Sequence, residues 1–201
     1  MELDLFQLEE IKKALLNHQV IAFPTETVMG FGVIFNDEIA YNRLNEIKGK
    51  REDKPYTLML GDVKEINKYG EVNDTAKKII DNFMPGSVTL ILKKKNNVPD
   101  YITHGRDTVG IRIPSNSEAL SLLKYIGVPL LVPSANRSGN PPCLNSDEVT
   151  KLFKDELGYI VEGSSTSFTP STIIDVSDGD IKILREGAVG KETILSLLEL
   201  L

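Results

Sequence analysis

The chain has 201 residues, of which 41% are hydrophobic and 26% charged, a composition typical of a globular protein with a substantial core. Its formal net charge of −6 disfavours a protein that coats nucleic acid through its overall field, although a local basic patch stays open. A single cysteine excludes an internal disulfide, and no stretch approaches the ~20 apolar residues of a membrane span. Because the N-terminus also lacks a signal-peptide pattern, we expect a cytoplasmic protein with no membrane contact and one domain over residues 1–201.

Apolar residues at helical spacing predict helices over residues 4–17, 37–48, 74–83, 117–126, 146–153 and 191–200. Asp4 and Asn36 are candidate caps for the first two of them. Short apolar runs predict strands at residues 20–23, 56–60, 88–92, 109–113, 128–132, 159–161, 171–175 and 181–184. Helices interleaved with strands predict an α/β or mixed α+β fold, in which a twisted mixed sheet is flanked by helices.

Several motifs of enzyme chemistry are absent from the sequence. It has no GxxxxGK[ST] phosphate loop, GxGxxG fingerprint, HExxH or GxSxG motif, and its two histidines and one cysteine do not cluster. This absence disfavours covalent and zinc-based catalysis. What the chain does carry is glycine and small polar residues beside the ends of its predicted strands.

The segment 24–32, PTETVMGFG, follows the first predicted strand. In an extended run Thr25 and Thr27 share one side, and the glycines let a ligand approach the backbone. The alternative is a glycine-containing turn whose hydroxyls bond their own backbone. The basic segment 48–55 is likewise open to two interpretations, a solvated helix end or a phosphate clamp.

In the strand TVGIRI, alternation sends Val109, Ile111 and Ile113 to one face and Thr108, Gly110 and Arg112 to the other. If the apolar set packs into the core, Arg112 is placed to bind a carboxylate or a phosphate; otherwise the strand is half exposed with Arg112 in solvent. Ser134 and Asn136 follow another strand, at the kind of strand end where open α/β sheets bind ligands. The Ser- and Thr-rich segment 162–171 is either a plain loop or a flap over a site.

Six segments, in this order, resemble the YrdC-domain family of threonylcarbamoyl-AMP synthases: VIAFPTETVMGFG, PGSVTLIL, TVGIRIP, PSANRSG, PSTIID and ILREGAV. The match covers nearly the whole chain, and we expect the short form, without the additional C-terminal domain that some relatives carry. The resemblance implies a twisted mixed sheet around a large, basic, concave cavity. It also implies a nucleotidyltransferase that joins L-threonine, bicarbonate or CO₂, and ATP into threonylcarbamoyl-AMP with release of pyrophosphate. A separate threonylcarbamoyl-transfer complex then modifies an adenosine of tRNA to t6A.

Carried over by position, the resemblance implies an L-threonine site formed by Thr27, Arg112, Ser134 and Ser171. It implies an ATP site formed by Lys48, Lys50, Lys54, Thr108, Asn136 and Arg185. No catalytic nucleophile is expected, because the carbamate of threonine can attack the α-phosphorus of ATP when both are held in place. No protein ligand to a metal is expected either, since Mg²⁺ would be bound through the ATP phosphates.

The chain departs from the family pattern at five positions, three of which are Met29, Ser87 and Leu144. Lys50 stands where relatives commonly have arginine, and Met59 stands where many have histidine, which removes a polar contact to threonine. Two other functions therefore stay open: an RNA-binding protein that uses the same basic cavity, and a paralogue that transfers another carbamoyl group. Weak tRNA binding also remains among the expected partners of the synthase.

Overall fold

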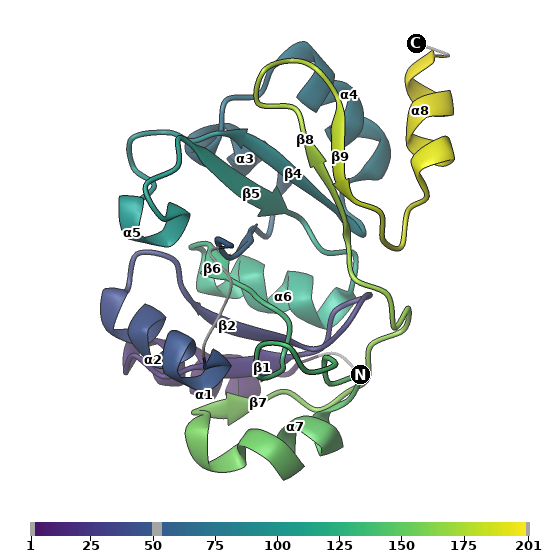
Figure 1. Ribbon diagram of the computed structural model, residues 1–201. Coiled ribbons are helices and arrows are strands. Elements are labelled where there is room, and N and C mark those ends of the chain that lie inside the picture. The colour runs from purple at the N-terminus through teal and green to yellow at the C-terminus, as the bar shows by residue number, and fades with distance from the viewer. Residues whose placement is uncertain (1–2, 50–53, 200–201) are drawn as a thin grey trace.

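The structure is a computed structural model and describes residues 3–49 and 54–199. Its strands are β1 (Ile21–Phe23), β2 (Gly30–Ile34), β3 (Leu58–Met59), β4 (Val88–Lys93), β5 (Thr108–Arg112), β6 (Leu130–Leu131), β7 (Tyr159–Ile160), β8 (Thr172–Asp175) and β9 (Lys182–Arg185). They form one sheet in the order β7-β1-β2-β6-β3-β5-β4-β8-β9 (Figure 1). The pairs β1–β7, β3–β5 and β4–β8 are parallel and the others antiparallel, which confirms the expected mixed sheet.

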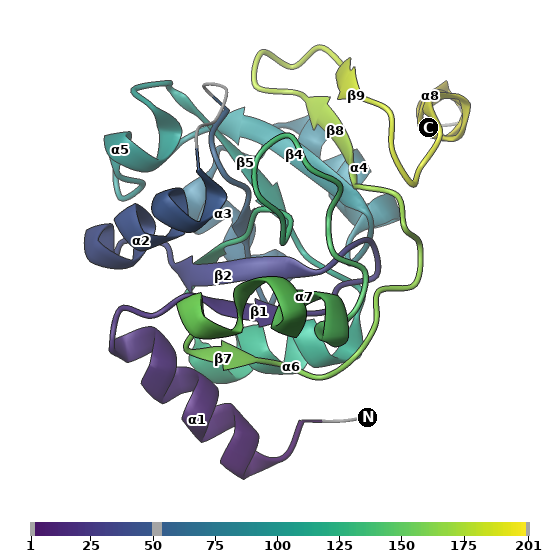
Figure 2. The same cartoon turned by 60° about the horizontal axis from the view of Figure 1, so that its bottom comes forward.

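The longer helices are α1 (Leu5–Leu16), α2 (Glu38–Lys48), α4 (Asp74–Phe83), α6 (Ser117–Ile126), α7 (Ser146–Phe153) and α8 (Lys191–Glu199). Single turns are formed by η1 (Val63–Glu65), α3 (Ile66–Tyr69), α5 (Asp100–Thr103) and η2 (Lys154–Glu156). Helices α1 and α7 pack on β1 and β7, whereas α4 packs on β4 (Figure 2). No helix in the described ranges is long and apolar enough to cross a membrane.

The predicted helices are confirmed to within a residue or two at each end, and the first begins at its predicted cap, Asp4. The cap of α2 is wrong by one residue: the Asp37 carboxylate, not Asn36, accepts the backbone N–H of Ala40 at 3.0 Å. The strand β2 was not predicted, because Gly30 and Gly32 lower strand propensity and made the segment read as a turn. The sheet nevertheless forces these residues into an extended conformation, between β1 and β6.

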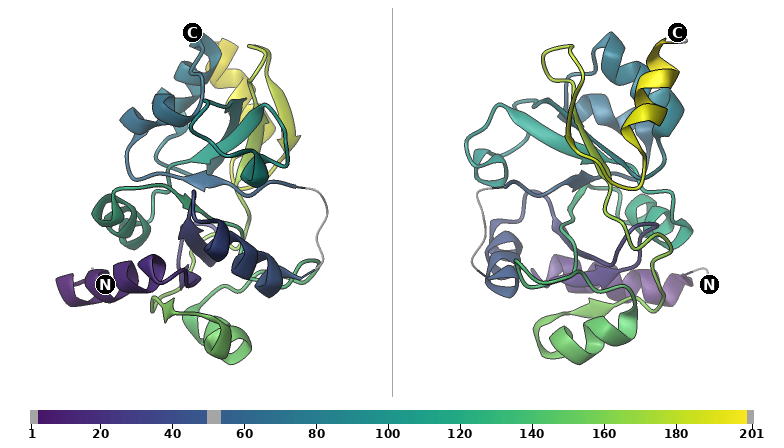
Figure 3. Two further views of the ribbon diagram at one scale, coloured as in Figure 1. Left: turned by 90° about the vertical axis from the view of Figure 1, so that its left-hand side faces the viewer. Right: turned by 45° about the vertical axis from the view of Figure 1, so that its right-hand side comes forward.

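The sheet has two halves that are joined by very short strands. One half holds β7, β1 and β2, and the other holds β5, β4, β8 and β9 (Figure 3). Between them lie β6 and β3, which are two residues long each, although longer runs at 128–132 and 56–60 were predicted. The segment 161–171, between β7 and β8, runs from one half to the other (Figure 1). We call β3 and β6 the waist of the sheet.

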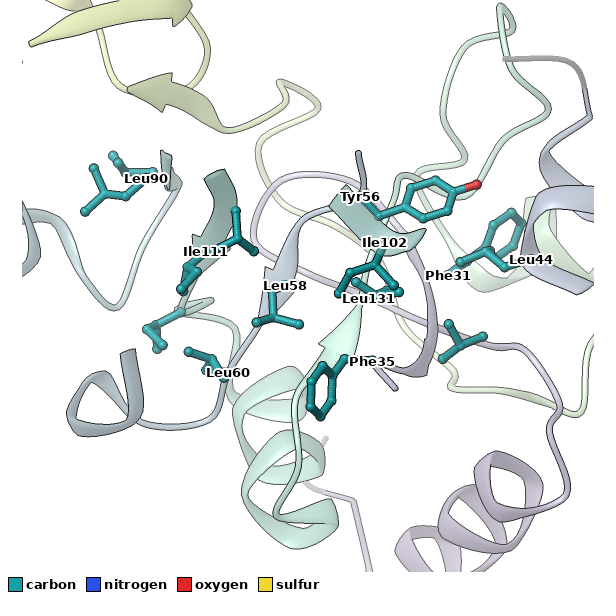
Figure 4. Packing of buried hydrophobic residues seen from close by; sticks show 14 of the residues in the cluster. Phe31, Phe35, Leu44, Tyr56, Leu58, Leu60, Leu90, Ile102, Ile111 and Leu131 are labelled. Atoms are coloured by element: carbon teal, nitrogen blue, oxygen red, sulfur yellow. The ribbon is translucent and has the colours of Figure 1, made fainter. Parts of the chain in front are cut away.

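The alternation predicted for β5 is confirmed. Val109 and Ile111 lie in the main hydrophobic core, where Leu58 of β3 lies between Ile111 and Leu131 of β6 (Figure 4). Arg112 projects to the opposite face of the sheet. Much of that face packs against α1 and α6 in a second hydrophobic cluster, which includes Met59, Leu122 and Leu130. The rest of that face, at Arg112, is left to form a site.

Candidate functional site

The opposite face of the sheet is hollowed into a cavity of about 350 Å³. Segments far apart in sequence meet there, because the cavity lies across the waist and draws on both halves. Seven of the predicted site residues line it: Thr27, Lys48, Lys54, Arg112, Ser134, Ser171 and Arg185. A larger hollow of about 770 Å³ lies by α1 and α7, but Glu118, Asp147 and Glu162 line it, and none of its described lining residues is a lysine or an arginine.

Arg112 is fixed in the wall of the cavity. Its Nε donates to the carbonyl of Gly86 at 3.2 Å, and its Nη2 donates to Glu26 Oε1 at 2.7 Å and to Thr27 Oγ1 at 3.1 Å. The side chains of this ion pair are only 7% and 13% exposed, respectively. Glu26 therefore balances the buried charge of Arg112 and holds its guanidinium in one orientation, a role that sequence analysis did not assign to it.

The hydroxyl group of Thr27 has a direction that follows from its neighbours. Thr25 Oγ1 donates its only proton to the carbonyl of Val28 at 2.7 Å. The 2.9 Å contact between the two threonine hydroxyls must then use the proton of Thr27. Because Thr27 also accepts a bond from Arg112, one lone pair remains, and towards a ligand this hydroxyl is an acceptor only.

Lys48, at the end of α2, is 5% exposed and connects the helix to the loop after β6. Its Nζ donates to the Ser134 carbonyl and to Asn136 Oδ1, both at 2.7 Å. The Ser134 hydroxyl also donates to Asn136 Oδ1, at 2.6 Å, so that this hydroxyl too faces a ligand as an acceptor. Asn136 is not among the residues that line the cavity; its side chain orders the loop that carries Ser134.

Arg185 and Ser171 form the other wall of the cavity. Arg185 donates from Nε and Nη2 to the Ser171 carbonyl at 3.1 and 2.8 Å, and the Ser171 hydroxyl lies 2.8 Å from that of Thr89. Burial, together with the nearby charge of Arg112, lowers the pKa of Arg185. Two guanidinium groups and Lys54 thus concentrate positive charge around one small volume.

Thr108 lies in a smaller adjoining cavity of about 160 Å³ rather than beside Arg112. The two cavities share Pro55, Tyr56, Thr57 and Ile173. Gly110 forms part of the floor of the smaller one, where an added Cβ would lie 3.1 Å from Ile91 Cδ1. The remaining predicted ATP residue, Lys50, lies outside the described residues.

The segment 162–171 is hydrogen-bonded to the loop that carries Glu26 and Thr27, the second of which lines the cavity. Ser167 N–H donates to the Glu26 carbonyl and Phe168 N–H to the Thr27 carbonyl, each at 3.1 Å. Phe168 has a φ of +57°, a left-handed conformation that a bulky residue seldom adopts. The segment therefore braces the loop that presents Glu26 and Thr27, which no pattern in its sequence indicates.

The two histidines and the single cysteine are not among the residues that line the cavity. His18 Nδ1 lies 2.7 Å from Asp37 Oδ2, and His104 Nε2 lies 3.0 Å from Tyr41 Oη. Cys143 is 3% exposed, and burial raises the pKa of its thiol. The cavity therefore combines cations, which bind anionic groups, with hydroxyl acceptors, which bind N–H or O–H donors.

Comparison with known proteins agrees with this arrangement. The family model named Sua5_yciO_yrdC and described as "Telomere recombination" matches residues 13–187. A putative threonylcarbamoyl-AMP synthase of Methanocaldococcus jannaschii is 38% identical over 90% of this chain and 86% of its own length. The threonylcarbamoyl-AMP synthase of Bacillus subtilis is 32% identical over 96% of this chain, which spans only 56% of that protein.

Two solved structures share the fold. Pyrococcus abyssi Sua5 complexed with L-threonine superposes with a TM-score of 0.93 at 31% identity, covering 98% of this chain and 59% of that one. Escherichia coli YciO superposes with a TM-score of 0.85 at 28% identity, covering 93% of this chain and 91% of that one. Both the sequence and the backbone therefore resemble proteins of one family throughout most of the chain.

Proposed function

Because this chain belongs to the Sua5, YciO and YrdC family, we propose that it is a threonylcarbamoyl-AMP synthase serving the t6A modification of tRNA. The observation that carries the proposal is the cavity itself. It joins Arg112, fixed and deeply buried, to Arg185 and Lys54 within about 350 Å³. An amino-acid carboxylate and a polyphosphate, side by side, are the anions that such a concentration of cations suits.

The amine of L-threonine adds to CO₂, supplied by bicarbonate, to form a carbamate and release a proton. A carbamate oxygen then attacks the α-phosphorus of ATP, the bond to the leaving oxygen breaks, and pyrophosphate departs, leaving threonylcarbamoyl-AMP. Neither step requires a protein nucleophile, since the reactants need only be held in line and their charge offset. This fits a cavity whose described lining residues include neither histidine nor cysteine.

In this proposal Arg112 holds the threonine carboxylate. Thr27 and Ser134 accept hydrogen bonds from the amine or the hydroxyl of the amino acid, because their own protons are already donated within the protein. Lys54 and Arg185 offset the charge of the phosphates. Lys48 holds the wall in place from its buried network and completes the positive field.

The metal chemistry of the site is expected to come with the nucleotide. No group of three or more His, Cys, Asp or Glu that could hold a metal ion occurs in the described part of the chain. Mg²⁺ favours octahedral oxygen ligands and commonly binds through substrate phosphates, where it neutralises their charge. The protein's contribution is to place the triphosphate beside the amino acid.

The decisive experiment measures pyrophosphate release by the purified protein with ATP, Mg²⁺, L-threonine and bicarbonate, omitting each substrate in turn. We expect release to require both threonine and bicarbonate. Release that ignores them would exclude the synthase. Release that needs bicarbonate but no amino acid would favour a paralogue acting on another carbamoyl compound, and salt-sensitive RNA binding without turnover would favour the RNA-binding alternative.

A further inference from the structure

Met59 occupies the position in the sheet next to Arg112. The strands β3 and β5 are parallel neighbours, and their register pairs Met59 with Arg112 and Leu58 with Ile111. Leu58 and Ile111 lie together in the main core, so Met59 and Arg112 share the opposite face, with their strands about 4.8 Å apart. A carboxylate held by Arg112 therefore brings the side chain of its amino acid close to Met59.

The part of the cavity around Met59 is mostly apolar, although the hydroxyl-bearing Thr57, two residues earlier on the same face, also lines it. Val28, Met59 and Val132 all line it and are at most 8% exposed. A methionine thioether is flexible and polarisable, packs well against methyl groups and is at most a weak hydrogen-bond acceptor. This wall of the cavity therefore recognises shape rather than polarity.

The hydroxyl groups of Thr27 and Ser134 can each contact a substrate hydroxyl, and both face the ligand only as acceptors. Thr27 Oγ1 has a single lone pair left, while its own proton and one other lone pair are satisfied within the protein. A substrate without a hydroxyl leaves no buried donor unpaired here, and the large penalty that rejects such substrates elsewhere is absent.

We infer that the side-chain subsite beside Arg112 selects a β-branched side chain by its shape and does not require the hydroxyl group. This inference rests on the proposed function and deepens it, since it defines the class of amino acid that the site accepts. L-valine, in which a methyl group replaces the hydroxyl of threonine, is then a better substrate than L-serine, in which hydrogen replaces the methyl group. A missing methyl in an apolar subsite costs about 10- to 200-fold in kcat/KM.

The test compares L-threonine, L-valine and L-serine in the pyrophosphate-release assay, with calorimetric titration of each amino acid as a second readout. We expect kcat/KM for valine to lie within about 100-fold of that for threonine and to exceed that for serine. If serine is the better substrate while threonine is turned over, the inference is wrong and the proposed function stands. If the wild-type protein neither binds nor turns over any of the three, both fail.

Two substitutions of Met59 provide the matched comparison. Met59→Leu keeps an apolar wall of similar volume, so the order valine over serine should be kept. Met59→Gln has nearly the same shape but adds an amide, which can bond a substrate hydroxyl, and it should move the ratio of serine to valine at least 10-fold towards serine. An unchanged ratio in a folded Met59→Gln variant, judged by its melting temperature, overturns the role of Met59. The wild-type comparison decides the inference even if that variant does not fold.

Discussion

Replacing Arg112 with methionine should damage the protein in two separable ways. The substitution leaves Glu26 buried without its cation, since the two side chains are 7% and 13% exposed and 2.7 Å apart. Breaking such a pair from one side costs about 3–5 kcal/mol. For a domain of this size that corresponds to a fall in melting temperature on the order of 10 °C. The same substitution removes the group proposed to hold the threonine carboxylate.

The double variant Arg112→Met with Glu26→Gln separates the two effects. With both charges gone, no uncompensated charge stays buried, and most of the lost stability should return. Threonine binding should not return, because a charged hydrogen bond contributes about 1.5–3 kcal/mol and its loss weakens binding roughly 10- to 100-fold. Differential scanning calorimetry and threonine titration of both variants provide the measurements. This reasoning is refuted if the single variant has the melting temperature of the wild type, or if the double variant binds threonine with the affinity of the wild type.

Three further outcomes are expected. Gly30→Ala should lower the free energy of unfolding in urea by about 1–3 kcal/mol, because the added Cβ would lie 2.6 Å from Val132 Cγ1. Adding Val132→Ala should recover part of this loss, and no recovery would contradict the clash. Lys48→Met should cost about 2 kcal/mol and should not add to Asn136→Ala, because the two side chains share one network; full additivity would contradict this. The thiol of Cys143 should resist a disulfide reagent until the chain unfolds. Because burial raises the pKa of that thiol, the thiol ionises at a lower pH in the unfolded chain than in the folded one, and stability should fall as pH rises above about 8.5. If the difference in stability between the wild type and Cys143→Ala does not change with pH, this explanation is wrong.

The helices and the α/β class could be predicted from the sequence because they depend on local features. The helical spacing of apolar residues and the cap at Asp4 are contained within one turn or two of chain. The alternation in β5 likewise placed Arg112 opposite the core. The strand β2 could not be predicted, since only pairing with β1 and β6 makes its glycines extended.

The partners within the site depend on contacts between distant segments. Glu26 meets Arg112 across 86 positions, and Lys48 meets Asn136 across 88, and no local pattern pairs them. The proximity of Met59 to Arg112 depends on the register of two strands, β3 and β5, that are far apart in the sequence. Through the family resemblance, sequence analysis could name seven of the residues that line the cavity, but not which of them hold one another.

The cavity lies across the waist of the sheet. The strands of the waist contain four residues, two in β3 and two in β6, and bonds such as Val132 N–H to the Thr57 carbonyl and Leu60 N–H to the Arg112 carbonyl extend their ladder. Thr27 comes from one side of the waist and Arg112 from the other, so a molecule that contacts both residues spans the waist. Arg112 already joins the two sides of the waist through its ion pair with Glu26 and its hydrogen bond to Thr27. A molecule bound in the cavity therefore adds to contacts that hold the two halves together.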